Sequence, residues 1–147
     1  MGVMGRIPRM RKSKASAALD RAEDPRETLD HSYELQVEHQ QKVRRGVADV
    51  ATAHKRLELQ VVQHGDSASA LGADAREAVS IGREDLAREA LTRKRAVESE
   101  IDSITVQRDQ LAAELEKLVA SERRVAARVE ESRGHKEVVK ATCTSAE

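Results

Sequence analysis

The sequence predicts an all-α protein in which an N-terminal amphipathic helix is followed by a long antiparallel coiled-coil hairpin. Among 147 residues Tyr33 is the only aromatic one, so the chain lacks the bulky side chains that usually fill a thick core. Charged residues make up 35% of the chain, which by itself would also suit a disordered protein. The apolar residues, however, recur at alternating steps of three and four over most of the length, and this period is typical of a coiled-coil seam.

Residues 1–22 are the first predicted element, a basic amphipathic arm. Residues 1–19 contain five cations and no acid, whereas the rest of the chain contains 21 basic and 26 acidic side chains. Cations interspersed with apolar residues are typical of a helix that lies in a membrane interface. The residues expected to contact the membrane are Val3, Met4, Arg6, Ile7, Arg9, Met10, Arg11, Lys12 and Lys14.

Other interpretations of the arm stay open. A disordered basic tail is one, and a mitochondrial presequence is another, because the arm is rich in arginine and free of acids. Nucleic-acid binding is disfavoured, since the arm has no aromatic side chain for base stacking and the body behind it is net negative. At roughly 1 kcal/mol per cation near an anionic leaflet, five cations give a weak anchor of about 5 kcal/mol. Firm membrane binding would therefore require many arms on one oligomer.

The first long helix is predicted over residues 23–81. Its start is marked by "EDPRE", in which Asp24 is a suitable N-cap, Pro25 suits the first helical position and Glu27 completes a capping box. Fifteen positions from 29 to 78 then alternate steps of four and three, and eleven of them are apolar: Leu29, Tyr33, Val43, Val47, Val50, Leu57, Val61, Ala68, Leu71, Ala75 and Ala78. The polar exceptions are Gln36, Gln40, His54 and His64.

Gly65 and Gly72 make one stretch of this helix weak, because each interior glycine costs about 1 kcal/mol relative to alanine. The three-four spacing continues through the stretch, which favours a tolerated soft spot. A hinge, or a hairpin turn displaced upstream, remains the alternative.

The hairpin turn is predicted at residues 82–85, which are Gly82, Arg83, Glu84 and Asp85. Glycine suits a left-handed helix C-cap, and acids favour the N-terminal end of a following helix. The second long helix, residues 86–147, carries a seam through Leu86, Ala90, Val97, Ile101, Ile104, Leu111, Leu115, Leu118, Val125, Val129, Val139 and Cys143. Its polar interruptions are Arg93, Arg108, Glu122, Ser132 and Lys136.

Two helices joined by so short a turn must lie antiparallel. The numbers of facing residues should then add to about 165 if the turn lies near Gly82. This places Leu29 near Lys136 and Tyr33 near Ser132.

The sequence predicts no enzyme, no metal site and no cofactor. It contains no phosphate loop and no nucleophile elbow, and its five histidines never stand three or four residues apart. A two-helix rod also lacks the concave pocket that catalysis needs. Cys143, the only cysteine, is interpreted as a small apolar residue near a helix end, with a reactive or metal-binding thiol as the alternative. No apolar run approaches the roughly 20 residues of a membrane span.

Three stretches carry a resemblance to a known family: "RAEDPRETLD" at 21–30, "VRRGVADV" at 43–50 and "GREDLAREAL" at 82–91. They resemble the phage shock protein A family, which includes the thylakoid vesicle-inducing protein and is related to ESCRT-III. The resemblance runs from Met1 to the last residue. It implies a membrane-binding helix over Met1 to Leu19, a long hairpin that turns at the start of "GREDLAREAL", and assembly into rings or rods on stressed anionic membranes. For enterobacterial members it also implies inhibition of an AAA+ transcription activator.

Two features depart from the family pattern. Pro8 and Arg11 fall where the family's first helix is usually continuous and apolar, and a proline confines regular helix to the residues from about Pro8 onward. Family members also continue into further helices where this sequence stops at "KATCTSAE". The resemblance therefore implies a C-terminally shortened member with a reduced apolar face on its arm.

The resemblance thus implies a bacterial envelope-stress protein, cytoplasmic and peripheral on the inner face of the plasma membrane. It would bind anionic membrane lipids and form homo-oligomers that maintain or remodel the membrane, without nucleic acid as a partner. The alternative is a soluble coiled-coil regulator that sequesters a transcription activator or another protein. A generic helical rod with neither activity is a third hypothesis.

Overall fold

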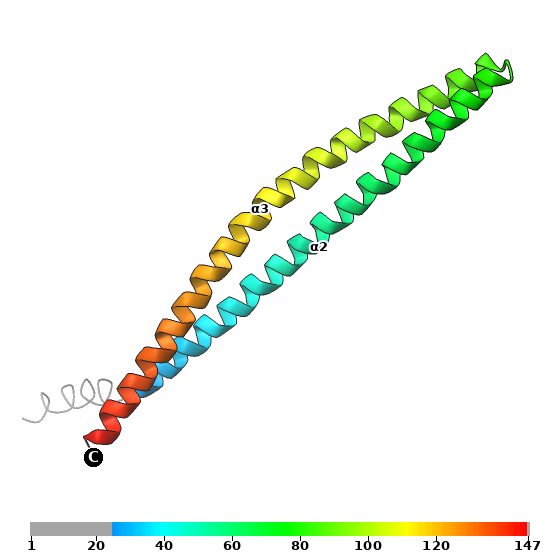
Figure 1. Ribbon diagram of the computed structural model, residues 1–147. Helices are drawn as coiled ribbons and strands as arrows, with labels where there is room; N and C mark the ends of the chain where they lie inside the picture. Colours follow the sequence, from blue (N-terminus) through cyan, green and yellow to red (C-terminus); the bar gives the residue numbers. More distant parts are fainter. Residues whose placement is uncertain (1–24, 147) are drawn as a thin grey trace, which may run out of the picture. The chain divides into compact units, whose positions relative to one another are not determined.

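The computed structural model describes residues 25–146, and they form two long helices. Helix α2 spans Pro25–Ser80 and helix α3 spans Glu84–Ser145 (Figure 1). The described part of the chain contains no strand. The prediction of an all-α fold is confirmed. The predicted amphipathic arm and Asp24 lie outside the described residues.

The start of α2 falls at a proline. Pro25 is its first residue and Glu27 lies in its first turn. A proline at the first helical position loses no hydrogen bond, because the first amides of a helix have no partner within the helix. An acid in the first turn is stabilised by the positive end of the helix dipole. These two residues account for the position of the helix start.

The turn between the helices is a Schellman motif that ends α2. Gly82 has a φ of +75° and is the only described residue in the left-handed region. The amide of Arg83 donates to the carbonyl of Ala78 at 2.8 Å, and the amide of Gly82 donates to the carbonyl of Val79 at 3.1 Å. Together they satisfy two carbonyls at the end of α2. The glycine is required because an L side chain is strained at this φ.

The turn is shorter than the predicted 82–85. Residues 81–83 lie between the helices, whereas Glu84 and Asp85 already belong to the first turn of α3. Arg83 is the N-cap, because its carbonyl accepts the first helical bond from the amide of Ala87 at 3.2 Å. The two acids favour helix at this place because they lie at the positive end of the α3 dipole.

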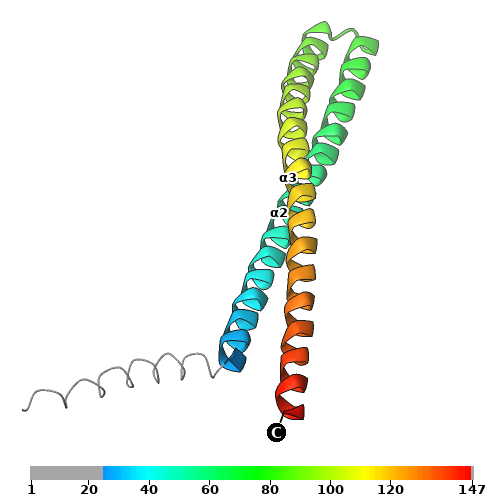
Figure 2. The same ribbon diagram turned by 90° about the vertical axis from the view of Figure 1, so that its left-hand side faces the viewer.

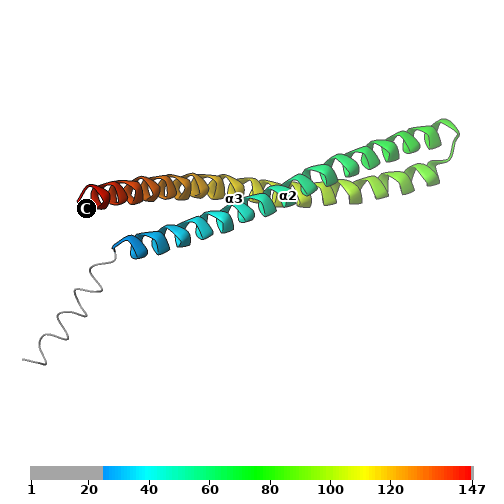
Figure 3. The ribbon, with the colours of Figure 1, turned by 90° about the horizontal axis from the view of Figure 1, so that it is seen from below.

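The contacts divide the chain into two compact units. We call residues 42–123, which contain the turn, the tip unit, and we call the described residues 25–41 and 124–146 the end unit. Within each unit the two helices run antiparallel and side by side. Figures 2 and 3 show this from two further directions, with the green residues around the turn in the tip unit and the blue and red residues in the end unit.

The predicted seam of α2 is confirmed throughout. All fifteen positions, from Leu29 to Ala78, are buried or half-buried. Gly65 and Gly72 lie within continuous helix, so a turn displaced upstream is excluded. The soft stretch is tolerated because the seam residues on both sides of it keep their contacts.

The seam at the start of α3 is different from the predicted one. Leu86 is 41% exposed and Arg93 is also exposed, while Ala87 is only 5% exposed and Lys94 is half-buried. Residues 87, 90, 94, 97 and 101 restore an unbroken three-four spacing along the helix. Ala87 faces α2 in place of the larger leucine because Ala75 and Ala78, 5% and 6% exposed, bring the two helices close together.

The paired residues fix the register in each unit. In the tip unit Arg44 pairs with Glu122 at 3.2 Å, and His64 lies 4.0 Å from Glu100. In the end unit Lys136 pairs with Asp30 at 2.7 Å. Their residue numbers add to between 164 and 166, in agreement with the expected value of about 165 for a turn near Gly82.

Candidate functional site

The residues predicted to contact a membrane lie outside the described part of the chain. They are Val3, Met4, Arg6, Ile7, Arg9, Met10, Arg11, Lys12 and Lys14. The described residues instead present open grooves on the hairpin, and two of these lie beside the turn.

An open groove follows one side of the tip unit next to the turn. Its apolar floor comes from Leu71 of α2, Ile81 of the turn and Leu86 of α3. Its edges carry three acids, Asp74, Glu77 and Glu89, and one cation, Arg93. We call these seven residues the acidic groove.

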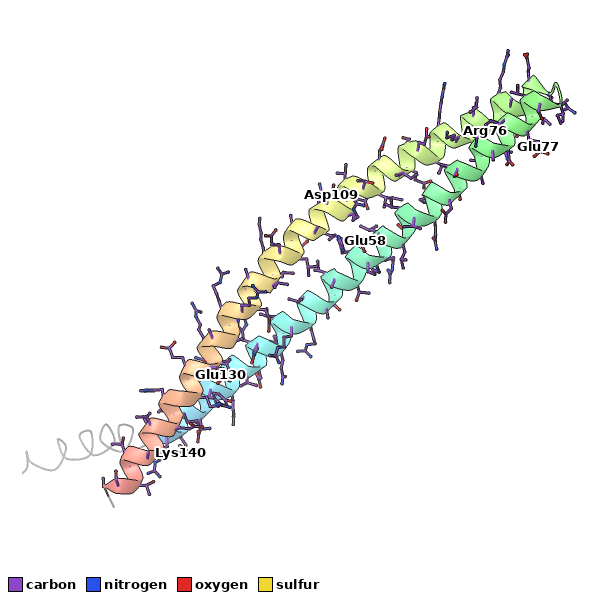
Figure 4. All side chains as sticks on the ribbon, in the orientation of Figure 1. Glu58, Arg76, Glu77, Asp109, Glu130 and Lys140 are labelled. Carbon is purple, nitrogen blue, oxygen red and sulfur yellow. The ribbon has the colours of Figure 1, made fainter. Side chains whose placement is uncertain are left out.

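A second open groove lies on another face of the same tip. Its apolar part includes Ala75, Val79 and Leu91, and two cations border it, Arg76 and Lys94. We call these five residues the basic groove. Arg76 and Glu77, labelled near the turn in Figure 4, belong to different grooves because consecutive helical residues point about 100° apart.

Large apolar side chains are exposed in both grooves. Ile81 is 67% exposed and Leu86 41% in the acidic groove, and Val79 is 62% and Leu91 44% exposed in the basic groove. Each groove therefore exposes two large apolar side chains, and exposed apolar groups of this kind can mark interaction sites. The sequence signal that could have revealed them is their position next to the alanine seam.

The charges near the turn are paired to different degrees. Arg83 donates two hydrogen bonds to Asp85, at 3.0 and 3.1 Å, and this contact lowers the pKa of the Asp85 carboxyl. Glu89 of the acidic groove pairs with Arg93 at 2.7 Å. Within residues 25–146, Asp74 and Glu77 have no cationic side chain within ion-pair distance. The acidic groove therefore carries two uncompensated carboxylates.

The end unit contains a polar cluster in its seam. The ammonium of Lys136 lies 2.7 Å from Oδ1 of Asp30 and 5.0 Å from the centre of the Tyr33 ring. Contact with the Lys136 ammonium lowers the pKa of Asp30, and contact with the carboxylate raises the pKa of Lys136. One turn further on, the Ser132 hydroxyl donates to Oε1 of Gln36. The cluster pairs specific residues across the seam, so its chemistry suits alignment of the helices rather than a reaction.

Among residues 25–146, no three histidine, cysteine or acidic side chains gather where they could hold a metal ion. Neither α2 nor α3 has a stretch apolar enough to cross a membrane.

Comparison with known proteins identifies the family. Residues 2–147 match the PspA/IM30 family. The chain belongs to the PspA/IM30 family. The match includes the arm as well as both helices of the hairpin, and it confirms the resemblance found in the three sequence stretches.

Several curated PspA/IM30 relatives align with almost the whole chain. The chloroplastic membrane-associated protein VIPP1 of Oryza sativa subsp. japonica is 32% identical over 98% of this chain and 45% of its own length. The membrane-associated protein Vipp1 of Nostoc punctiforme is 29% identical over 99% of this chain and 57% of its own length. The chloroplastic VIPP1 of Arabidopsis thaliana is 27% identical over 99% of this chain. The chain thus spans about half the length of the relatives it matches.

Proposed function

We propose that this chain is a peripheral membrane protein that binds anionic bilayers through its basic arm and self-associates through its hairpin to maintain or remodel the membrane. The supporting observation is the family match, which extends through residues 2–147 and therefore includes the arm. The relatives that align with it are named membrane-associated proteins. The proposed place of action is the inner face of the plasma membrane, during envelope stress.

The charge of the arm explains why self-association belongs to the same proposal. Five cations and no acid occur in residues 1–19, and near an anionic leaflet they contribute roughly 1 kcal/mol each. A single arm would therefore bind reversibly. Several arms displayed on one assembly would bind together much more tightly, because each bound arm raises the effective concentration of the next.

The predicted helix boundary and the predicted hairpin turn also have roles in this proposed function. Asp24, Pro25 and Glu27 would form the joint between arm and hairpin, and the turn around Gly82 and Arg83 would expose the grooves of the tip. The role is non-enzymatic: the described surfaces are open grooves and ion pairs, which suit binding.

Cosedimentation with liposomes tests the membrane part. The full chain should pellet with vesicles rich in phosphatidylglycerol and much less with neutral phosphatidylcholine vesicles, and added salt should weaken the binding because it screens the cations. Replacing Arg9, Arg11 and Lys12 by glutamate should abolish pelleting. A control in which the exposed Arg45, Arg56 and Arg123 of the hairpin are replaced by glutamate should keep it. Equal pelleting of the chain with and without residues 1–19 would contradict the proposal.

A second candidate is a soluble regulator that sequesters a protein partner such as a transcription activator. The exposed apolar residues at the tip, Ile81 and Val79 above all, favour it because they suit a protein contact. A lipid-free pull-down with a purified activator distinguishes the two candidates. Capture that is lost in an Ile81→Ser variant would support the regulator, and no capture would contradict it.

A further inference from the structure

The acidic groove of the tip has features that the hairpin itself does not use. Ile81 and Leu86 stay 67% and 41% exposed although the alanine seam beside them is closed. Asp74 and Glu77, on the edge of the same groove, have no cationic partner among the described residues. An occupant that satisfies both features must bring apolar side chains together with positive charge.

One segment of this chain has that composition. Residues 1–19 contain five cations and no acid, together with Val3, Met4, Ile7 and Met10. The cations complement the two unpaired carboxylates, and the apolar residues suit the exposed floor of the groove. The basic groove is a poor fit for the same segment because Arg76 and Lys94 border it and no acid of the described residues lines it, whereas Arg93 of the acidic groove is paired with Glu89.

The occupant comes from a second copy of the chain. In one chain the arm precedes Pro25, whereas the groove begins near the other end of α2, so most of the 56 helical residues of α2 stand between them. A helix of that length cannot fold back on itself. Two copies meet no such restriction.

We infer that the acidic groove at the hairpin tip binds the basic arm of a second copy of this chain. The contact joins copies through charge and apolar burial in the absence of lipid. Because the same arm is proposed to bind anionic lipid, a step that rests on the proposed function, vesicles compete with the groove for it.

Disulfide trapping between full-length copies tests the contact. All variants carry Cys143→Ser, one copy carries Met10→Cys, and a size-tagged second copy carries Ile81→Cys in the acidic groove. The matched control carries Val79→Cys, which is similarly exposed at 62% but borders the basic groove. After brief oxidation with copper–phenanthroline in lipid-free buffer, the Ile81→Cys copy should give about fivefold more mixed dimer than the control, as expected for a preference near 1 kcal/mol.

Charge variants test the cause of the preference. Asp74→Asn with Glu77→Gln keeps the shape of two exposed side chains and should reduce trapping at Ile81→Cys to the control level. Asp74→Arg with Glu77→Arg should abolish it, and reversing Arg9 and Arg11 to glutamate in the first copy should restore it. Equal trapping at residues 79 and 81, or trapping that the Asn/Gln variant leaves unchanged, would overturn the inference. Trapping within a single copy that carries both cysteines would overturn the assignment to a second copy.

Anionic vesicles separate this inference from the proposed function. If both hold, phosphatidylglycerol vesicles suppress trapping at Ile81→Cys and phosphatidylcholine vesicles do not. Trapping that persists at full strength while the protein fails to pellet would support the groove contact and contradict the membrane function. Pelleting without any trapping in lipid-free buffer would support the membrane function and overturn the groove contact.

Discussion

Beside the turn α2 and α3 meet through alanines, whereas in the end unit they meet through valines and paired polar side chains. Ala75, Ala78 and Ala87 are 5–6% exposed near the turn, and Val125 and Val129 are 8% and 6% exposed in the end unit. The alanines allow close approach of the helices and place the neighbouring large residues outside the seam. The grooves of the tip are a consequence of that approach.

The polar contacts of the end unit have a different consequence. The alanines beside the turn specify register only weakly by themselves, because their side chains are small and alike. The Asp30–Lys136 pair and the Ser132–Gln36 hydrogen bond exist in one register only. Polar residues within a helical seam specify register in this way, at some cost in stability. The alanines beside the turn thus allow close approach, while polar pairs align the helices in the end unit and, through Arg44 and Glu122, in the rest of the tip unit.

The largest expected effect comes from filling the alanine seam. Ala87→Leu inserts three carbons where α3 meets Ala75 and Ala78, and it should lower the free energy of unfolding by about 1–3 kcal/mol through overpacking. Leu86→Ala, one residue away and exposed, should change it by less than about 0.5 kcal/mol. Urea unfolding followed by circular dichroism measures both. If Leu86→Ala lowered the free energy of unfolding more than Ala87→Leu, the close approach of the helices at the tip would be refuted.

The next effect concerns the glycines of the tip unit. Gly82→Ala should lower the free energy of unfolding by about 1–2 kcal/mol, because alanine is strained at a φ of +75°. Gly65→Ala should raise it by about 0.5–1 kcal/mol, since its new Cβ meets no atom within 4 Å in the helix interior. Thermal unfolding of the two variants and the wild type shows directly whether each substitution raises or lowers the stability. A stabilised Gly82→Ala variant would rule out the Schellman turn.

The smallest expected effect is the pH dependence of the stability of the end unit. The pKa of Asp30 is lowered from 3.8, so its contact with Lys136 contributes stability above that pH and loses it as the pH falls through the lowered value. The pKa of Lys136 is raised from 10.5, so the contribution is complete below that pH and is lost as the pH rises through the raised value. Because both side chains are partly exposed to solvent, 24% for Lys136 and 42% for Asp30, the effect is modest.

Lys136→Met tests this window. The variant should be less stable than the wild type between about pH 4 and pH 10, and the two should converge outside that range. Asp30→Asn should show the same window, and the double variant should add little to either single change because the two residues act as a pair. A stability difference that is constant from pH 2 to pH 12 would show that packing of Lys136 against Tyr33, and not the ion pair, accounts for it.

The two ends of α2 were accessible from the sequence. Pro25 marks the start of α2 and Gly82 marks its end, and both follow from local backbone chemistry. The acidic groove was not predicted, because its existence depends on which of two adjacent residues, Leu86 or Ala87, faces α2. Hydrophobicity favours the leucine, and the mistaken choice of Leu86 and Arg93 as seam residues followed from it. Steric fit against Ala75 and Ala78 favours the alanine.

The sequence by itself determined two long helices and their antiparallel arrangement. It also determined their register, in which the numbers of facing residues add to about 165. Period, capping residues and a single left-handed glycine are local properties, and a short connection leaves only one direction for the second helix. Only the tertiary structure decided which face of α3 closes on α2 at the tip and which charges stay unpaired there. That choice depends on the distance between two helix axes, which is set by side chains on both helices at once and is not a property of either one alone.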